Sequence, residues 1–266
     1  MRAEVLVDPE KPKINKRHVL SMLRAAGIEH STKADFGVVV GGDGLFSHYG
    51  RETSTPLLFV GTKSETPTDS KAHLAEVMVE DLEPALHAIA AGKFTVERYK
   101  RLGVSVSGSL KGESFTDISL EKGADSNCIR YTLRVKGAGL DFTDWAVSNG
   151  VVITTKAGST GYFSYIDKLR MGDTLEPTRF TIIGKDEAGV CHIAPTFTSR
   201  EGSTEHPLRY AVPWGAVFTI RLTRDADAHL FGITRGAHKG IRITTKDTLV
   251  VRPSRHTTNV MRLLAS

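Results

Sequence analysis

The hydrophobic pattern of this 266-residue chain changes near residue 92, and that change limits the fold more than any other feature. Before it, short apolar runs alternate with segments of helical spacing, as in a doubly wound parallel sheet. After it, short β-branched segments separated by glycines and polar turns indicate many strands. The sequence predicts a small α/β domain with a Rossmann-like parallel sheet, residues 1–92, and a larger β-sandwich-like domain, residues 93–266. Whether Val260 to Leu264 return to the first domain is left open.

The elements expected in the first domain follow from the spacing of their apolar residues. A helix is predicted over Lys16 to Ala26, and Asp81 is expected to cap a second helix over Leu82 to Ala91. Phe36 to Val40 and Leu57 to Val60 are continuous apolar runs, as expected for strands that are buried on both faces.

The composition is that of an ordinary globular protein, with 40% hydrophobic and 24% charged residues. The formal net charge is +5, but Lys and Arg are interspersed with acids, so we expect no nucleic-acid partner. No apolar run is long enough to span a bilayer and no secretory signal begins the chain, so we expect no membrane partner. Two isolated cysteines, Cys128 and Cys191, fit a reducing cytoplasm, and no residue spacing predicts a metal site.

The first candidate site is the loop Gly41-Gly42-Asp43-Gly44, which follows the apolar run Phe36 to Val40. Glycines let the backbone approach a ligand closely, and ligands of open α/β sheets bind outside the carboxyl ends of the strands. The loop is neither a P-loop nor a dinucleotide-binding fingerprint. The alternative is a tight turn with a solvated aspartate.

The second candidate site begins at Ser148-Asn149-Gly150, where an apolar strand starts, and continues into the loop from Lys156 to Tyr162. The loop contains Gly158, Ser159, Thr160 and Gly161, whose N–H groups and hydroxyls could hold phosphate or ribose oxygens. Tyr162 adds a flat face for a base. The alternative is an ordinary loop that opens a helix.

Together the two motifs resemble the NAD kinase family, in which they read GGDGT and TPTGSTAY and which also joins an α/β domain to an all-β domain. Between them the family has an Asn-Glu or Asn-Asp pair, where this chain has Thr116-Asp117. The chain departs from the family at Leu45, Thr116, Asn149 and Lys156. It also lacks the family's Leu-Gly-Phe after the next strand, where this chain has Gly61-Thr62-Lys63-Ser64-Glu65.

The resemblance implies a kinase that transfers a phosphoryl group from ATP or polyphosphate, with Mg²⁺ or another divalent cation, to the 2′-hydroxyl of the adenosine ribose of NAD, forming NADP. Asp43 would be the catalytic base. The residues implied to bind NAD are Asp43, Gly44, Thr116, Asp117, Asn149, Thr160, Gly161, Tyr162 and Tyr165. Those implied near phosphate are Gly41, Gly42, Lys156 and Ser159. The resemblance also implies a homo-oligomer, either a dimer or a tetramer.

Two other functions remain open from the sequence. Lipid kinases of the diacylglycerol or sphingosine type share a GGDGT loop and a β-rich domain, but they normally lack a loop like the one from Gly158 to Tyr162. A non-catalytic nucleotide-binding or regulatory protein would explain the eroded motifs, but it would not need the carboxylate of Asp43.

Overall fold

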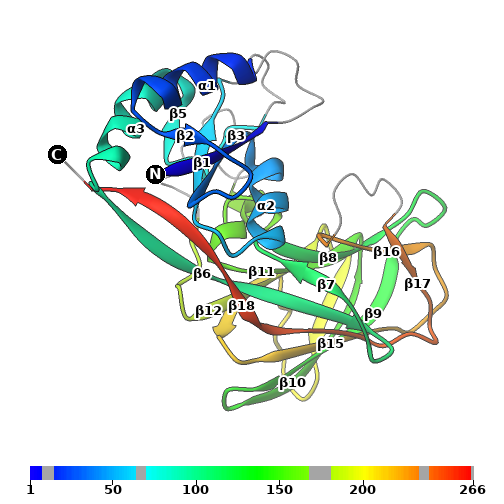
Figure 1. The fold of residues 1–266 in the computed structure, drawn as a ribbon. Helices are drawn as coiled ribbons and strands as arrows, with labels where there is room; N and C mark the ends of the chain where they lie inside the picture. The colour runs from blue at the N-terminus through cyan, green and yellow to red at the C-terminus, as the bar shows by residue number, and fades with distance from the viewer. Residues whose placement is uncertain (8–14, 64–69, 168–180, 234–239, 265–266) are drawn as a thin grey trace. The chain divides into compact units, whose positions relative to one another are not determined.

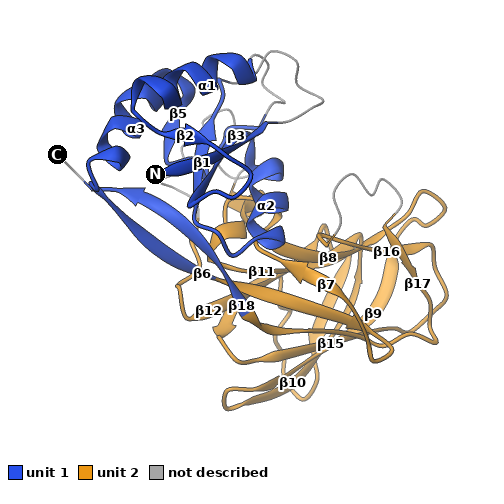
Figure 2. Ribbon diagram, viewed as in Figure 1, with its two compact units in different colours: residues 1–99, 256–266 blue, residues 100–255 orange. Residues whose placement is uncertain are grey.

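The computed structural model describes residues 1–7, 15–63, 70–167, 181–233 and 240–264. The chain forms two compact units: residues 1–99 with 256–266, and residues 100–255 (Figure 2). The predicted domain boundary at residue 92 stays a prediction. Two long strands, β6 (Phe94–Val106) and β18 (Leu249–Leu263), contribute residues to both units.

The first unit is built on a parallel sheet with the strand order β2-β1-β3-β4. Val260 of β18 pairs in parallel with Leu57 of β4, so the end of the chain joins this sheet. The strands are β1 (Arg2–Val7), β2 (Glu29–His30), β3 (Phe36–Gly41), β4 (Leu57–Gly61) and β5 (Val77–Met78), the last beside β4. All residues of β3 and β4 are buried, as the apolar runs predict.

Helices cover both faces of this sheet (Figure 1). Helices α1 (Lys16–Ala25) and α3 (Leu82–Ala90) pack with alternate residues of β3 and β4 on one face. On the other face lies α2 (Asp43–Glu52), whose Phe46 stacks on Phe59 with ring centroids 4.7 Å apart. A short 3₁₀ turn, η1 (Val79–Asp81), precedes α3. Asp81 stands at the N-cap of α3 as predicted, but its side chain makes no capping hydrogen bond.

The second unit consists of two antiparallel sheets. The first has the order β14-β12-β11-β8-β16-β17, and the second contains β13-β10-β9-β15 and the start of β18, with the hairpin of β6 and β7. The strands are β7 (Ser109–Ser114), β8 (Asp117–Lys122), β9 (Ile129–Gly137), β10 (Leu140–Ser148), β11 (Gly150–Thr154), β12 (Glu187–Ile193), β13 (Phe197–Arg200), β14 (Arg209–Pro213), β15 (Val217–Leu222), β16 (Ala228–Phe231) and β17 (Ile241–Ile243).

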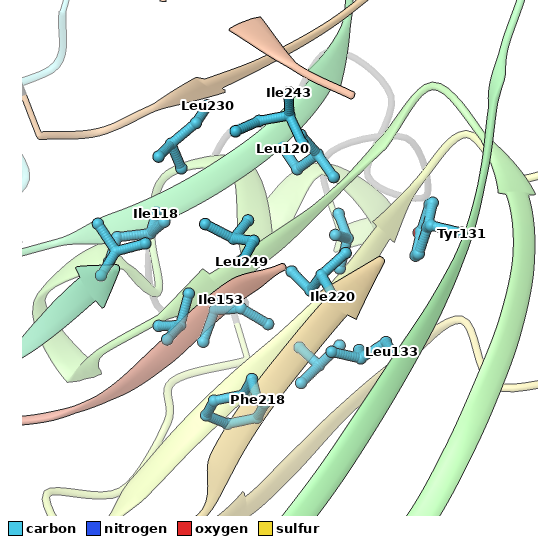
Figure 3. Packing of buried hydrophobic residues seen from close by; sticks show 14 of the residues in the cluster. Ile118, Leu120, Tyr131, Leu133, Ile153, Phe218, Ile220, Leu230, Ile243 and Leu249 are labelled. Carbon is cyan, nitrogen blue, oxygen red and sulfur yellow. The ribbon is translucent and has the colours of Figure 1, made fainter. Parts of the chain in front are cut away.

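One hydrophobic core lies between these sheets. Leu120 and Ile153 of the first sheet join the same buried cluster as Leu133 and Phe218 of the second (Figure 3). Two apolar faces pressed together in this way form a β-sandwich. The predicted fold class, a small α/β part followed by a β-sandwich-like part, is confirmed. No helix in the described part of the chain combines the length and hydropathy that crossing a membrane requires.

Candidate functional site

The loop of three glycines and Asp43 joins the buried strand β3 directly to helix α2. Gly41 ends the strand, Gly42 is the N-cap residue, and Asp43 is the first residue of the helix. The alternative of a hairpin turn is therefore wrong, because a helix and not an antiparallel strand follows. A carboxylate here lies at the carboxyl end of a parallel strand and beside the N–H groups that open a helix, where ligands of α/β sheets bind.

The carboxylate of Asp43 is held by a segment that follows β4. Oδ2 accepts hydrogen bonds from the Ser70 hydroxyl at 3.2 Å and from the backbone N–H of His73 at 3.1 Å. Oδ1 accepts one from the backbone N–H of Leu74 at 2.9 Å. The backbone N–H of Asp43 in turn donates to the Ser70 hydroxyl at 3.0 Å. The side chain is therefore fixed in one orientation while it remains partly exposed.

The glycines before Asp43 leave room for neighbouring side chains. A Cβ atom added at Gly42 would lie 2.6 Å from the Cβ of Ser70, and one added at Gly41 would lie 2.7 Å from Cδ2 of Leu45. Gly44 has open space around it. Packing against Ser70 therefore requires a glycine at position 42, whereas the contact at Gly41 is with the end of a flexible leucine side chain.

In the second unit, strand β8 carries acidic side chains on the face away from the core. Ile118 and Leu120 belong to the core cluster, so the alternate residues Asp117, Ser119 and Glu121 lie on the opposite face. The Ser119 hydroxyl donates to Glu121 at 2.5 Å. Burial, and secondly the charge of Glu121, raise the pKa of Asp117 to about 7. Its carboxyl group can therefore exchange a proton near neutral pH.

The loop of the second motif lies over this face. A Cβ atom added at Gly161 would be 3.4 Å from Oδ2 of Asp117. The charge of Glu121, together with burial and the charge of Asp117, raises the pKa of the Tyr162 phenol. The Tyr162 side chain is 54% exposed. The aromatic ring can stack on a base. The two carboxyl groups beside it can accept hydrogen bonds from amine or hydroxyl donors.

Asn149 lies at a fixed turn before β11. Its backbone N–H donates to Ile193 at 2.9 Å, and its carbonyl accepts from Lys122 at 2.8 Å. The hydroxyls of Ser148 and Tyr131 both donate to the carbonyl of Gly150. The Asn149 side chain makes no hydrogen bond to any residue that the structure describes. The backbone of Asn149 is therefore fixed, and its side chain is partly exposed.

Two predicted site residues have structural roles that occupy their polar atoms. The Ser159 hydroxyl is fully buried and accepts from the backbone N–H of Ile183 at 3.0 Å. The Tyr165 hydroxyl donates to the carbonyl of His192 at 3.1 Å and accepts from Ala194 at 3.2 Å. The first contact joins Ser159 to the segment before β12, and the other two join Tyr165 to the end of β12.

The remaining predicted residues of the second unit are partly exposed. Lys156 lies in the turn η2 (Lys156–Gly158), and Thr160 precedes the turn η3 (Tyr162–Ser164). The carbonyl of Thr116 accepts from the backbone N–H of Thr155 at 2.8 Å, which places the pair Thr116-Asp117 beside the loop.

Sequence reasoning missed four residues of these sites: Ser70, His73, Leu74 and Glu121. The first three lie in a polar segment with no periodicity, and two of them act through backbone N–H groups that any residue type carries. Glu121 could have been found, because it follows Asp117 at the spacing that keeps two side chains on one face of a strand.

Neither set of residues forms a metal centre by itself. In the described ranges, no group of three or more His, Cys, Asp and Glu side chains is placed to hold a metal ion. Asp43 lies in the first unit, and the residues around Asp117 lie in the second.

The chain was compared with known proteins. No family model matches it. It is similar to the NAD kinase of Methanopyrus kandleri, with 30% identity over 167 residues, 60% of this chain and 53% of that protein. It is also similar to the NAD kinase of Caldanaerobacter subterraneus subsp. tengcongensis, with 24% identity over 240 residues, 87% of this chain and 75% of that protein. The chain thus spans about half the length of the first of these relatives.

Two solved structures have the same fold. The NAD kinase from Archaeoglobus fulgidus, in complex with ATP, matches with a TM-score of 0.65 and 20% identity, over 99% of this chain and 93% of that one. Yeast NADH kinase, complexed with NADH, matches with a TM-score of 0.70 and 13% identity, over 100% of this chain and 84% of that one.

These likenesses and the geometry lead to one classification. An α/β unit with an aspartate between a buried strand and a helix, followed by a β-sandwich, defines the two-part fold class that these kinases share. Within that class the chain is similar in sequence to curated NAD kinases.

Proposed function

We propose that this protein is an NAD kinase that transfers a phosphoryl group from ATP to the 2′-hydroxyl of the adenosine ribose of NAD, forming NADP. The observation that carries the proposal is the position of Asp43, at the carboxyl end of a buried parallel strand and at the start of α2. The similarity to curated NAD kinases supports the choice of reaction. The loop from Gly158 to Tyr162 supports a nucleotide rather than a lipid as the acceptor.

Asp43 is proposed as the general base. A ribose hydroxyl is a weak nucleophile, and a carboxylate within hydrogen-bond reach orients it and accepts its proton. The hydroxyl oxygen forms the new bond to the γ-phosphorus as the bond to the β-phosphate oxygen breaks, and ADP leaves. Gly44, which has open space around it, lets backbone and ligand approach each other closely at this point. Gly41 and Gly42 are proposed to lie near phosphate on the family resemblance.

The residues of the second unit are proposed to bind nucleotide. Asp117 and Asn149 offer hydrogen-bonding groups for ribose or for the edge of a base, and Tyr162 offers a stacking face. Thr116, Thr160 and Gly161 would complete this surface, on the strength of the family resemblance. Lys156 would contact phosphate. Ser159 and Tyr165 would act by holding the loop, since their hydroxyls are bonded within the protein.

The divalent cation is proposed to arrive with ATP. Mg²⁺ usually keeps several waters and is held through the phosphates of its substrate with one or two carboxylates. Polyphosphate stays a possible donor, and ATP is the nucleotide bound to the structural relative from Archaeoglobus fulgidus. We further propose a cytoplasmic homo-oligomer, a dimer or a tetramer. The two unpaired cysteines support the compartment, and the family resemblance supports the assembly.

The decisive experiment measures NADP⁺ formation from NAD⁺ and MgATP by the purified protein and by Asp43→Asn. We expect the substitution to lower kcat at least 100-fold, because it removes the base, while calorimetry shows nucleotide binding within a few-fold of the wild type. Asp81→Asn is the matched control, since Asp81 also stands at the start of a helix of the same unit.

Each result of that experiment has one meaning. Turnover by the wild type and by Asp81→Asn, but not by Asp43→Asn, supports both the reaction and the base. Turnover that survives in Asp43→Asn refutes the assignment of the base. Nucleotide binding without any turnover by the wild type refutes the reaction and favours a nucleotide-binding regulatory protein.

A further inference from the structure

We propose that Ser70 is a positioning residue for the reaction and acts through Asp43. Its hydrogen bond determines which oxygen of the Asp43 carboxylate faces the ribose hydroxyl that accepts the phosphoryl group. This inference rests on the proposed function. Ser70 lies 27 residues after Asp43, and it belongs to neither of the two glycine motifs.

The bonding partners of the Ser70 hydroxyl determine which hydrogen bonds it accepts and which one it donates. A hydroxyl has one donor and two acceptor sites. Its oxygen accepts from the backbone N–H of Asp43 at 3.0 Å and from the backbone N–H of Ala72 at 3.3 Å. Both acceptor sites are then occupied, so its one proton is left for Oδ2 of Asp43, at 3.2 Å.

These bonds leave the two oxygens of Asp43 unequal. Oδ2 accepts two hydrogen bonds, from Ser70 and from the N–H of His73, and Oδ1 accepts one, from the N–H of Leu74. An ionised carboxylate has about two acceptor sites on each oxygen. Oδ1 therefore keeps a site for the acceptor hydroxyl, and the proton of that hydroxyl passes to Oδ1.

The close approach of Ser70 also gives a reason for Gly42. The Cβ atom that any other residue would add at this position would lie 2.6 Å from the Cβ of Ser70 and 2.7 Å from its hydroxyl oxygen. The glycine before the aspartate and the serine after β4 thus fit together, and the serine reaches Asp43 because the glycine has no side chain.

The test compares steady-state kinetics of Ser70→Ala, Ser70→Thr and the wild type, with NAD⁺ and MgATP varied separately. For Ser70→Ala we expect kcat to fall roughly 10- to 100-fold, because the carboxylate loses its fixed orientation, with both KM values within about 2-fold of the wild type. Ser70→Thr keeps the hydroxyl and should recover most of kcat. Ser21→Ala, which removes a hydroxyl from the surface of α1, is the matched control.

Thermal denaturation of each variant separates positioning from folding. A fall in kcat with unchanged KM values, a retained unfolding temperature and rescue by threonine supports the inference. An unchanged kcat in Ser70→Ala overturns it, and so does a loss of activity that follows a loss of stability and is not rescued. These outcomes differ from failure of the proposed function, in which the wild type itself makes no NADP⁺.

Discussion

The surroundings of Asp117 disfavour the ionised form of its carboxyl group. Burial and the neighbouring charge of Glu121 raise its pKa to about 7, whereas the pKa of an aspartate in an unfolded chain is near 4. Because the folded state holds the proton more tightly, this residue favours folding below pH 4. That contribution is lost as the pH rises through 7. A residue that costs stability at neutral pH and lies beside a candidate nucleotide loop is typical of a functional position.

Asp117→Asn should therefore stabilise the ligand-free protein at high pH. At pH 8 we expect the free energy of unfolding to rise by about 2 kcal/mol, allowing for partial exposure, and at pH 4.5 by much less. Urea denaturation at the two pH values measures the difference. The exposed Asp125 gives the control Asp125→Asn. An equal effect of Asp117→Asn at both pH values would contradict the assignment of the raised pKa.

Single residues were predictable from sequence where a motif marks them. Asp43 and Tyr162 stand out because glycines surround them next to apolar runs, and the structure places both at the start of a helix or helical turn. Ser70 has no such mark, since its role depends on a contact with a residue 27 positions away. Serines are common in polar loops, so only the folded arrangement distinguishes this one.

Helix α2 begins with a glycine on each side of Asp43, and the two glycines have different surroundings. Gly42 meets Ser70, whereas Gly44 is exposed and has nothing within 4 Å of its added Cβ. The same substitution at the two positions therefore separates a steric requirement from an intrinsic helix preference.

Gly42→Ala should destabilise the protein by about 1–3 kcal/mol, because the added methyl group forces Ser70 away from Asp43. Gly44→Ala should instead stabilise it by about 0.5–1 kcal/mol, because alanine has a higher helix propensity than glycine. Thermal or urea denaturation of both variants provides the comparison. If both substitutions shift the stability in the same direction and by similar amounts, the contact between Gly42 and Ser70 does not constrain the loop.

Elements with a simple burial pattern were predictable. Helix α1 and strands β3 and β4 lie within a residue of their predicted bounds, because an amphipathic stripe and a fully apolar run are unambiguous. Strand β6, which extends over Phe94–Val106, has no such simple pattern. Its first half is mostly exposed and polar, and pairing with β18, far along the chain, makes it a strand.

At the scale of the whole molecule, the first unit is discontinuous in sequence. Residues 256–264 belong to this unit although they follow the entire second unit in the chain, and Val260 among them pairs with β4. Arg262 joins this last strand to other residues of the first unit. Its guanidinium pairs with Glu76 at 2.7 Å and with Glu97 at 3.1 Å, and it also bonds the Tyr99 hydroxyl. Burial lowers the pKa of the guanidinium, but the bonds and charges of Glu76, Tyr99 and Glu97 outweigh it, so that the pKa is raised.

Arg262→Ala should weaken the first unit selectively. We expect a loss of about 1–3 kcal/mol, because two partly buried carboxylates lose their partner. In hydrogen exchange, the amides of β3 and β4 should lose protection while those of β9 and β11 keep theirs. Arg17→Ala, an exposed arginine of α1, should change neither set. Uniform loss of protection across both units would refute the selective role of Arg262.

The division into an α/β part and a β-rich part was predictable, because a change from helical spacing to short β-branched segments is visible in sequence. The pairing of Val260 with β4 was not predictable, because the sequence of an apolar strand does not identify the strand beside it.

The position of β18 also has a consequence for synthesis of the chain. A ribosome releases residues in order, so residues 100–255 are all available before the strand that pairs with β4 has left the exit tunnel. The second unit can therefore mature first, although it is made later than most of the first. The unit that carries Asp43 therefore lacks the strand that pairs with β4 until residues 256–264 have been made.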